Sequence, residues 1–160
     1  MTANIHDPEW DAEMDRAPYR WQRSLLGRRA GSERLGASLF DVPPGGATFP
    51  FHAHHANEEL LVVLRGAPAL RTPDGERTLA EGEVVALPAG RQGAHAITNR
   101  STAPVRIMIV STMIAPDINE FPDSGTLWAR SFAPGAVVPD GGVMAVGKVG
   151  DTFDPFAGGV

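Results

Sequence analysis

Turn signals recur at short intervals along most of this sequence, and they limit what the chain can fold into. Glycine (18) and proline (14) together make up a fifth of the 160 residues. Dense clusters at Pro43–Gly46 and Thr72–Gly75 favour tight turns. Between such signals, stretches of roughly four to eight strand-forming residues recur every ~8–12 residues. This spacing is typical of an all-β barrel or sandwich.

The same punctuation gives the expected strands. They are Arg20–Leu26, Leu35–Val42, Phe49–His54, Glu59–Arg65, Ala69–Thr72, Glu76–Leu79, Glu83–Leu87, Ala94–Asn99 and Val105–Met113. A chain of this length is expected to form one compact domain with a core of its own. We expect an N-terminal arm over residues 1–18, a barrel over 19–115 and a short irregular C-terminal extension over 116–160. Pro116, Pro122, Pro134 and Pro139 interrupt that extension, so it should pack on the barrel in short pieces.

Composition excludes several function classes. The net charge of −5 and the lack of a basic stripe argue against nucleic acid as a partner. With no cysteine, the chain has no disulfide, thiolate nucleophile or cysteine zinc site. No apolar run approaches the ~18 residues of a membrane span, and the N-terminal residues are too acidic for a secretory signal. We therefore expect a cytoplasmic protein that binds neither membranes nor nucleic acid.

Histidines and a carboxylate suggest a metal site. His52 and His54 are two residues apart, so on one strand both imidazoles point to the same face. Glu58 and Glu59 follow shortly after, and His95 lies in a second segment punctuated by glycine and proline. Three imidazoles and one carboxylate suit a divalent first-row metal. His55, the remaining histidine of this segment, has the opposite parity and should point away.

The spacing of these residues resembles the two motifs of the cupin superfamily. Gly46, His52, His54, Glu59 and Gly66 stand at the intervals of the first motif. The second motif is matched by five further residues, namely Gly82, Pro88, Gly90, His95 and Asn99. The family has two residues between that last glycine and that histidine, whereas this chain has four. The match favours Glu59 over Glu58, because only Glu59 leaves six residues before Gly66.

The resemblance implies a cupin-type β-barrel, that is, a double-stranded jelly roll. It also implies one divalent transition-metal ion per chain (Fe, Mn, Ni or Zn), held by His52, His54, Glu59 and His95. Small single-domain bacterial cupins of this type suggest a homodimer. For the aromatic residues of the early strands, pairing with a partner subunit and packing inside one chain both remain open.

A metal-dependent enzyme acting on a small molecule is the leading functional hypothesis. Four protein ligands in an octahedral shell leave two positions open, and the cupin chemistries expected there are of dioxygenase, isomerase or cyclase type. The residues expected to line the substrate pocket are Arg91, Gln92, Leu61, Val63, Ile97 and Met108. Their largely apolar character favours an apolar or aromatic substrate. The alternatives are a non-catalytic protein that binds or senses a small ligand, and a sugar or sugar-phosphate isomerase.

The histidine ligands also predict a pH dependence. Because an imidazole must be neutral to bind a metal, metal occupancy is expected to fall as the pH drops below ~6.5.

Overall fold

The computed structural model describes residues 2–136 and 138–150, and its regular structure is almost entirely antiparallel β. The largest sheet has six strands in the order β1-β2-β3-β10-β5-β8. The strands of this sheet are β1 (Ala12–Arg16), β2 (Tyr19–Ser24), β3 (Leu35–Val42), β5 (Glu59–Arg65), β8 (Val84–Leu87) and β10 (Val105–Thr112).

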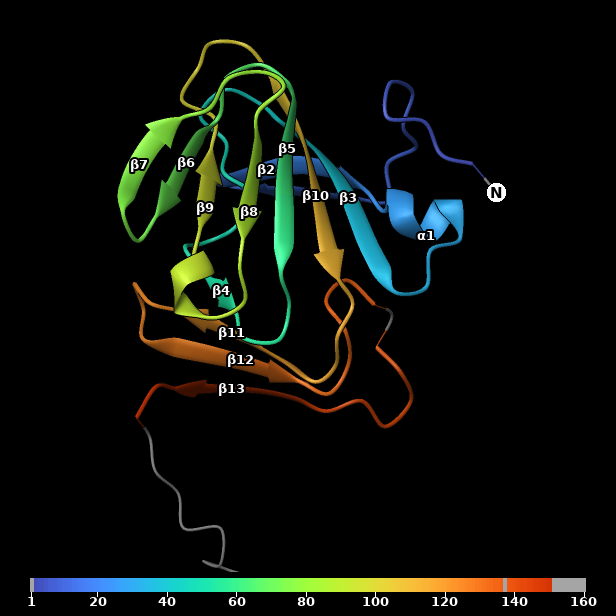
Figure 1. Cartoon of the computed structure of the whole chain (residues 1–160), viewed down its shortest axis with the longest axis vertical. Coiled ribbons are helices and arrows are strands. Elements are labelled where there is room, and N and C mark those ends of the chain that lie inside the picture. The colour runs from blue at the N-terminus through green and yellow to red at the C-terminus, as the bar shows by residue number, and fades with distance from the viewer. Residues whose placement is uncertain (1, 137, 151–160) are drawn as a thin grey trace, which may run out of the picture.

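Two smaller sheets complete the barrel and cover one end of it (Figure 1). The three-stranded sheet β7-β6-β9 consists of β6 (Ala69–Thr72), β7 (Gly75–Thr78) and β9 (Ala96–Thr98). The four-stranded sheet β13-β12-β11-β4 consists of β4 (Ala53–His54), β11 (Asp117–Phe121), β12 (Thr126–Arg130) and β13 (Met144–Lys148). Two single-turn helices, α1 (Leu26–Ala30) and the 3-10 helix η1 (Arg91–Gly93), lie in the connections. Within the described residues, no helix is long and apolar enough to cross a membrane.

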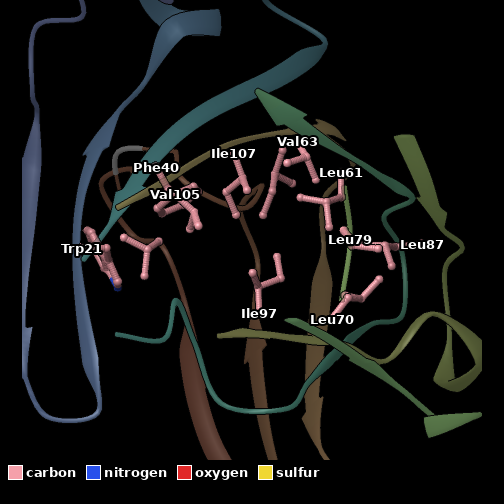
Figure 2. Packing of buried hydrophobic residues seen from close by; sticks show 12 residues of the cluster. Trp21, Phe40, Leu61, Val63, Leu70, Leu79, Leu87, Ile97, Val105 and Ile107 are labelled. Atoms are coloured by element: carbon pink, nitrogen blue, oxygen red, sulfur yellow. The ribbon is translucent and has the colours of Figure 1, made fainter. Parts of the chain in front are cut away.

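Alternating side chains of the barrel strands form one hydrophobic core. Along β10, for example, every second residue from Val105 to Ser111 is buried. The core side chains point toward one another in the space between the sheets (Figure 2). They are Trp21, Phe40, Val42, Leu61, Val63, Leu70, Leu79, Leu87, Ile97, Val105, Ile107 and Ile109. Trp21 and Phe40 also pack against Phe49 with ring centroids 5.6–5.8 Å apart. These three aromatic residues of the early segments therefore pack inside one chain.

The inner face of the barrel changes character along its axis. On β5 the buried positions are Glu59, Leu61 and Val63, in that order. Leu61 and Val63 belong to the packed core, whereas Glu59 lines a cavity. The same gradient occurs on β10, where Ile107 is core and Ser111 lines the cavity. The barrel is thus filled at one end and hollow at the other.

The predicted all-β barrel is confirmed, and the bounds of β3, β5 and β6 are those expected from the sequence. The strand predicted over Phe49–His54 is wrong in extent, because only Ala53–His54 forms a regular strand. Pro50 has no N–H to donate to a ladder, and the segment before His52 consists of bends.

The expected arm and extension stay predictions as divisions of the chain. Within them the structure places β1, which pairs with β2, and the strands β11 to β13. Residues 151–160 of the expected extension lie outside the described residues. The expected homodimer also stays a prediction.

Candidate metal centre

The segment that carries the first two histidines passes from one sheet to another. The His52 N–H donates to the His95 carbonyl oxygen at 3.0 Å, and the His95 N–H donates to the His52 carbonyl oxygen at 2.8 Å. Two residues later, His54 pairs with Asn119 of β11. Both imidazoles nevertheless keep the same parity and face one cavity, with ring centroids 5.2 Å apart. The backbone bridge also brings the His95 ring to 4.6 Å from the His52 ring.

Glu59 reaches the same point from the first residue of β5. One of its carboxylate oxygens lies 3.8 Å from His54 Nε2, and the other lies 3.4 Å from His95 Nε2. Its neighbour Glu58 is exposed. The ligand atoms of His52, His54 and Glu59 lie within 4.8 Å of one another, and such a group could hold one metal ion. The spacing thus agrees with the choice of Glu59 over Glu58.

The outer nitrogen of each histidine is held by a hydrogen-bond acceptor. His52 Nδ1 lies 2.8 Å from the Pro50 carbonyl oxygen, and His95 Nδ1 lies 2.9 Å from the Gly93 carbonyl oxygen. A carbonyl only accepts, so Nδ1 carries the proton and Nε2 keeps a free lone pair. His54 Nδ1 lies 2.7 Å from an Asp117 carboxylate oxygen. Metal-binding histidines are held in this manner in proteins. The donor set therefore fits a divalent first-row metal.

A buried ion pair supports His54 from behind. Asp117 accepts a hydrogen bond from Arg130 Nη2 at 3.0 Å, and Arg130 also donates to the Asn119 side-chain oxygen. Burial raises the pKa of Asp117, but hydrogen bonds from His54, Arg130 and the Ala56 N–H outweigh it and hold this pKa well below its usual value. Asp117 therefore stays ionised and keeps accepting from His54.

Burial has the opposite consequence for the imidazoles. It lowers the pKa of His52 to about 3, with the neighbouring His95 and His54 contributing in the same direction. Burial also lowers the pKa of His95, although the Glu59 carboxylate partly opposes this shift. Both rings therefore stay neutral in mild acid. Competition by protons at these two rings begins at a lower pH than the ~6.5 expected from the sequence.

The depressed pKa of His52 predicts an acid-sensitive fold in protein stripped of metal. The folded value of about 3 lies below the unfolded value of 6.5. Between these values the unfolded chain binds a proton that the folded chain does not, so the stability from neutral His52 is lost as the pH falls. We expect the free energy of unfolding in urea to drop less between pH 7 and pH 4.5 in His52→Gln than in wild type. The exposed His6 provides the control His6→Gln, which should behave as wild type; equal losses in all three proteins would contradict the prediction.

The four side chains open into a cavity of about 360 Å³. Its wall comes from the hollow end of the barrel and from the segments that follow β10. The wall is mostly apolar, with Phe40, Phe49, Ile109, Met113, Phe121, Trp128, Phe132, Pro134, Ala136, Val138 and Met144. Its polar members besides the ligand group are Arg23, Ser38, Ser111, Asn119 and Arg130. A small, largely apolar molecule fits such a surface.

A family model of the cupin domain matches residues 38–111, from β3 to the end of β10. The matched segment is a cupin domain. Among curated proteins, none matches the sequence. The matched segment holds both halves of the histidine and glutamate group, and cupins often bind a metal.

Solved structures share this cupin fold. One is a sugar phosphate isomerase of the cupin superfamily from Silicibacter pomeroyi, which is 21% identical with a TM-score of 0.76, over 97% of this chain and 98% of that one. The polyketide cyclase RemF from Streptomyces resistomycificus is 26% identical with a TM-score of 0.57, over 70% of this chain and 80% of that one. At 21% identity, the similarity to the Silicibacter pomeroyi protein shows a shared fold and nothing more.

The residues expected at the substrate pocket lie elsewhere in this cupin. Leu61, Val63 and Ile97 are fully buried in the packed core. Each lies on its strand two or more residues beyond the nearest proposed ligand, toward the filled end of the barrel. Met108 has the opposite parity to the buried Ile107 and Ile109 of β10, so its side chain leaves the interior. Arg91 and Gln92 are exposed on η1, where Arg91 pairs with Glu120 at 2.9 Å. None of the six is among the residues that line the cavity beside His52.

Several site residues were not identified from the sequence. Asp117, Asn119 and Arg130 come from the proline-interrupted segment after Ala115, and Arg23 comes from β2. The one available signal was the alternation of polar residues at Asp117 and Asn119, which places both on one face of a strand.

Proposed function

We propose that this cupin binds one divalent transition-metal ion through His52, His54, Glu59 and His95 and acts on a small, largely apolar or aromatic molecule. The observation that carries the proposal is the set of hydrogen bonds at the three Nδ1 atoms, which directs the Nε2 atoms of His52 and His95 into the cavity as free lone pairs. The third, His54 Nε2, lies 3.1 Å from the Asn119 side-chain nitrogen, so an ion would replace that contact. A bound divalent ion would supply a Lewis acid that polarises an oxygen atom of the ligand.

The cavity supports the choice of substrate. Its aromatic side chains offer flat apolar surfaces on which a ring can stack and from which water is excluded. Phosphate recognition calls for several convergent cationic groups. The cavity has two arginines among the described residues, and one of them, Arg130, is already paired with Asp117. The name of the Streptomyces neighbour, a polyketide cyclase, agrees with this substrate class better than the name sugar phosphate isomerase.

Reconstitution of metal-free protein tests the proposal. The protein is loaded in turn with Fe(II), Mn(II), Ni(II) and Zn(II), its metal content is measured by elemental analysis, and turnover and oxygen uptake are followed with aromatic, apolar and phosphosugar compounds. We expect about one ion per chain and turnover of an apolar or aromatic compound only in loaded protein. His54→Ala should lose both.

The adjacent histidine is the matched control. His55 points away from the cavity and pairs with Glu120 at 2.9 Å, so His55→Ala should keep the metal and the activity. Ligand binding without turnover would favour a non-catalytic binding protein, and turnover of phosphosugars alone would favour an isomerase. Metal retained in full by His54→Ala would overturn the proposed site.

A further inference from the structure

Arg23 is a cation on the cavity wall whose charge has no partner in the described part of the chain. It lies on β2 two residues from the buried Trp21 and opposite Phe40 of β3, so it belongs to the inner face of the sheet. Its Nε is buried without a hydrogen-bond partner, and no ion pair or hydrogen bond joins its guanidinium to residues 2–136 or 138–150. The guanidinium carbon of Arg23 lies over the Trp21 ring, 5.6 Å from the ring centroid.

The nearby acidic groups are already committed. Asp11 accepts hydrogen bonds from Arg29 at 2.7 Å and from the Leu25 N–H at 2.7 Å. Glu59 belongs to the proposed metal site, and Asp117 is paired with Arg130. A partly buried guanidinium without a counter-charge is costly. A ligand that brought a negative charge into the cavity would remove this cost.

The charge of the cavity points to the same conclusion. Glu59 offsets one of the two charges of a divalent ion, and Asp117 offsets Arg130. The ion and Arg23 then leave two positive charges around a space that is otherwise walled by aromatic rings. An apolar molecule with an anionic group would be attracted to both of these charges.

We propose that the ligand of the cavity is an aromatic or otherwise apolar carboxylic acid and that Arg23 binds its carboxylate. The inference rests on the proposed function, since it concerns the same cavity. A guanidinium offers two parallel N–H groups that match one carboxylate. Phosphate is disfavoured, because Arg23 is the one unpaired cation that the described residues present to the cavity.

Binding of three matched probes tests the inference without any measurement of activity. The probes are 2-naphthoate, its neutral analogue 2-naphthamide and 2-naphthyl phosphate, titrated by calorimetry into metal-free and metal-loaded protein. We expect 2-naphthoate to bind wild type more tightly than either other probe. Arg23→Gln should weaken 2-naphthoate by about 10- to 100-fold in both forms of the protein, and it should leave 2-naphthamide unchanged.

Two further variants keep the result interpretable. Arg23→Lys retains the positive charge but loses the two parallel N–H groups of the guanidinium. Its affinity for 2-naphthoate should therefore lie between those of wild type and Arg23→Gln. The exposed Arg16 on β1 gives the control Arg16→Gln, which should bind all probes as wild type does. Metal content should be unchanged in every variant.

A wild type that binds no metal yet shows the Arg23 effect would refute the proposed function alone. Equal affinity for 2-naphthoate and 2-naphthamide, tighter binding of the phosphate, or no binding of any probe would overturn the inference.

Discussion

Replacing His95 with alanine is expected to weaken metal binding by more than about 100-fold, because loss of an outer partner of a ligand alone costs roughly 10- to 100-fold. His95 is buried, and its Nε2 lies 3.4 Å from a Glu59 oxygen. It is also the one proposed ligand that comes from the second sequence motif. Its removal leaves three proposed ligands, namely His52, His54 and Glu59.

Competition with a chelator of known affinity measures this effect on folded protein. The exposed His6 gives the control His6→Ala, which should bind the metal as wild type does. Unchanged affinity in His95→Ala would mean that the site consists of His52, His54 and Glu59 alone, whose ligand atoms already lie within 4.8 Å of one another.

The second large effect is expected from Gly93→Ala, at the end of η1. A Cβ at Gly93 would lie 1.8 Å from the Pro88 carbonyl oxygen, so the backbone itself must move. Overpacking of this kind typically destabilises a protein by about 1–3 kcal/mol and at times by more. The Gly93 carbonyl oxygen also accepts the hydrogen bond from His95 Nδ1. The displacement should therefore weaken metal binding as well as the fold.

Urea unfolding and a metal titration read the two effects separately. Gly147→Ala on the exposed strand β13 is the matched control, because nothing lies within 4 Å of its added Cβ. We expect this variant to keep the stability and metal affinity of wild type. If Gly93→Ala were as stable as Gly147→Ala, the tight packing of η1 against Pro88 would be refuted.

Local signals in the sequence were sufficient for most of the barrel. The turn clusters and the strand-forming stretches between them predicted β3, β5 and β6 with the bounds that the structure shows. Parity predicted that His52 and His54 share a face, and it did so although the segment changes its pairing partner between them. Parity depends on neighbouring residues alone, so it survives such a change.

The depth of each residue in the barrel and the side chains that support His54 could not be derived from local signals. Alternation shows that Glu59, Leu61 and Val63 share the inner face of β5, but not which of them reaches the hollow end of the barrel. That depth is set by how far the strands of three sheets are shifted against one another. The support from Asp117 and Arg130 is non-local too, since each is more than 60 residues from His54 in sequence.

The pairing of His54 with β11 ties the proposed ion to a part of the chain outside the matched cupin segment. The His54 ring meets Asp117, and its backbone meets Asn119, so both ends of this residue are fastened to the same strand. Thermodynamic reciprocity then applies: whatever ion binding gains from a seated β11, the seating of β11 gains from the bound ion. Loss of the proposed cation would thus loosen β11, and detachment of β11 would speed release of the cation.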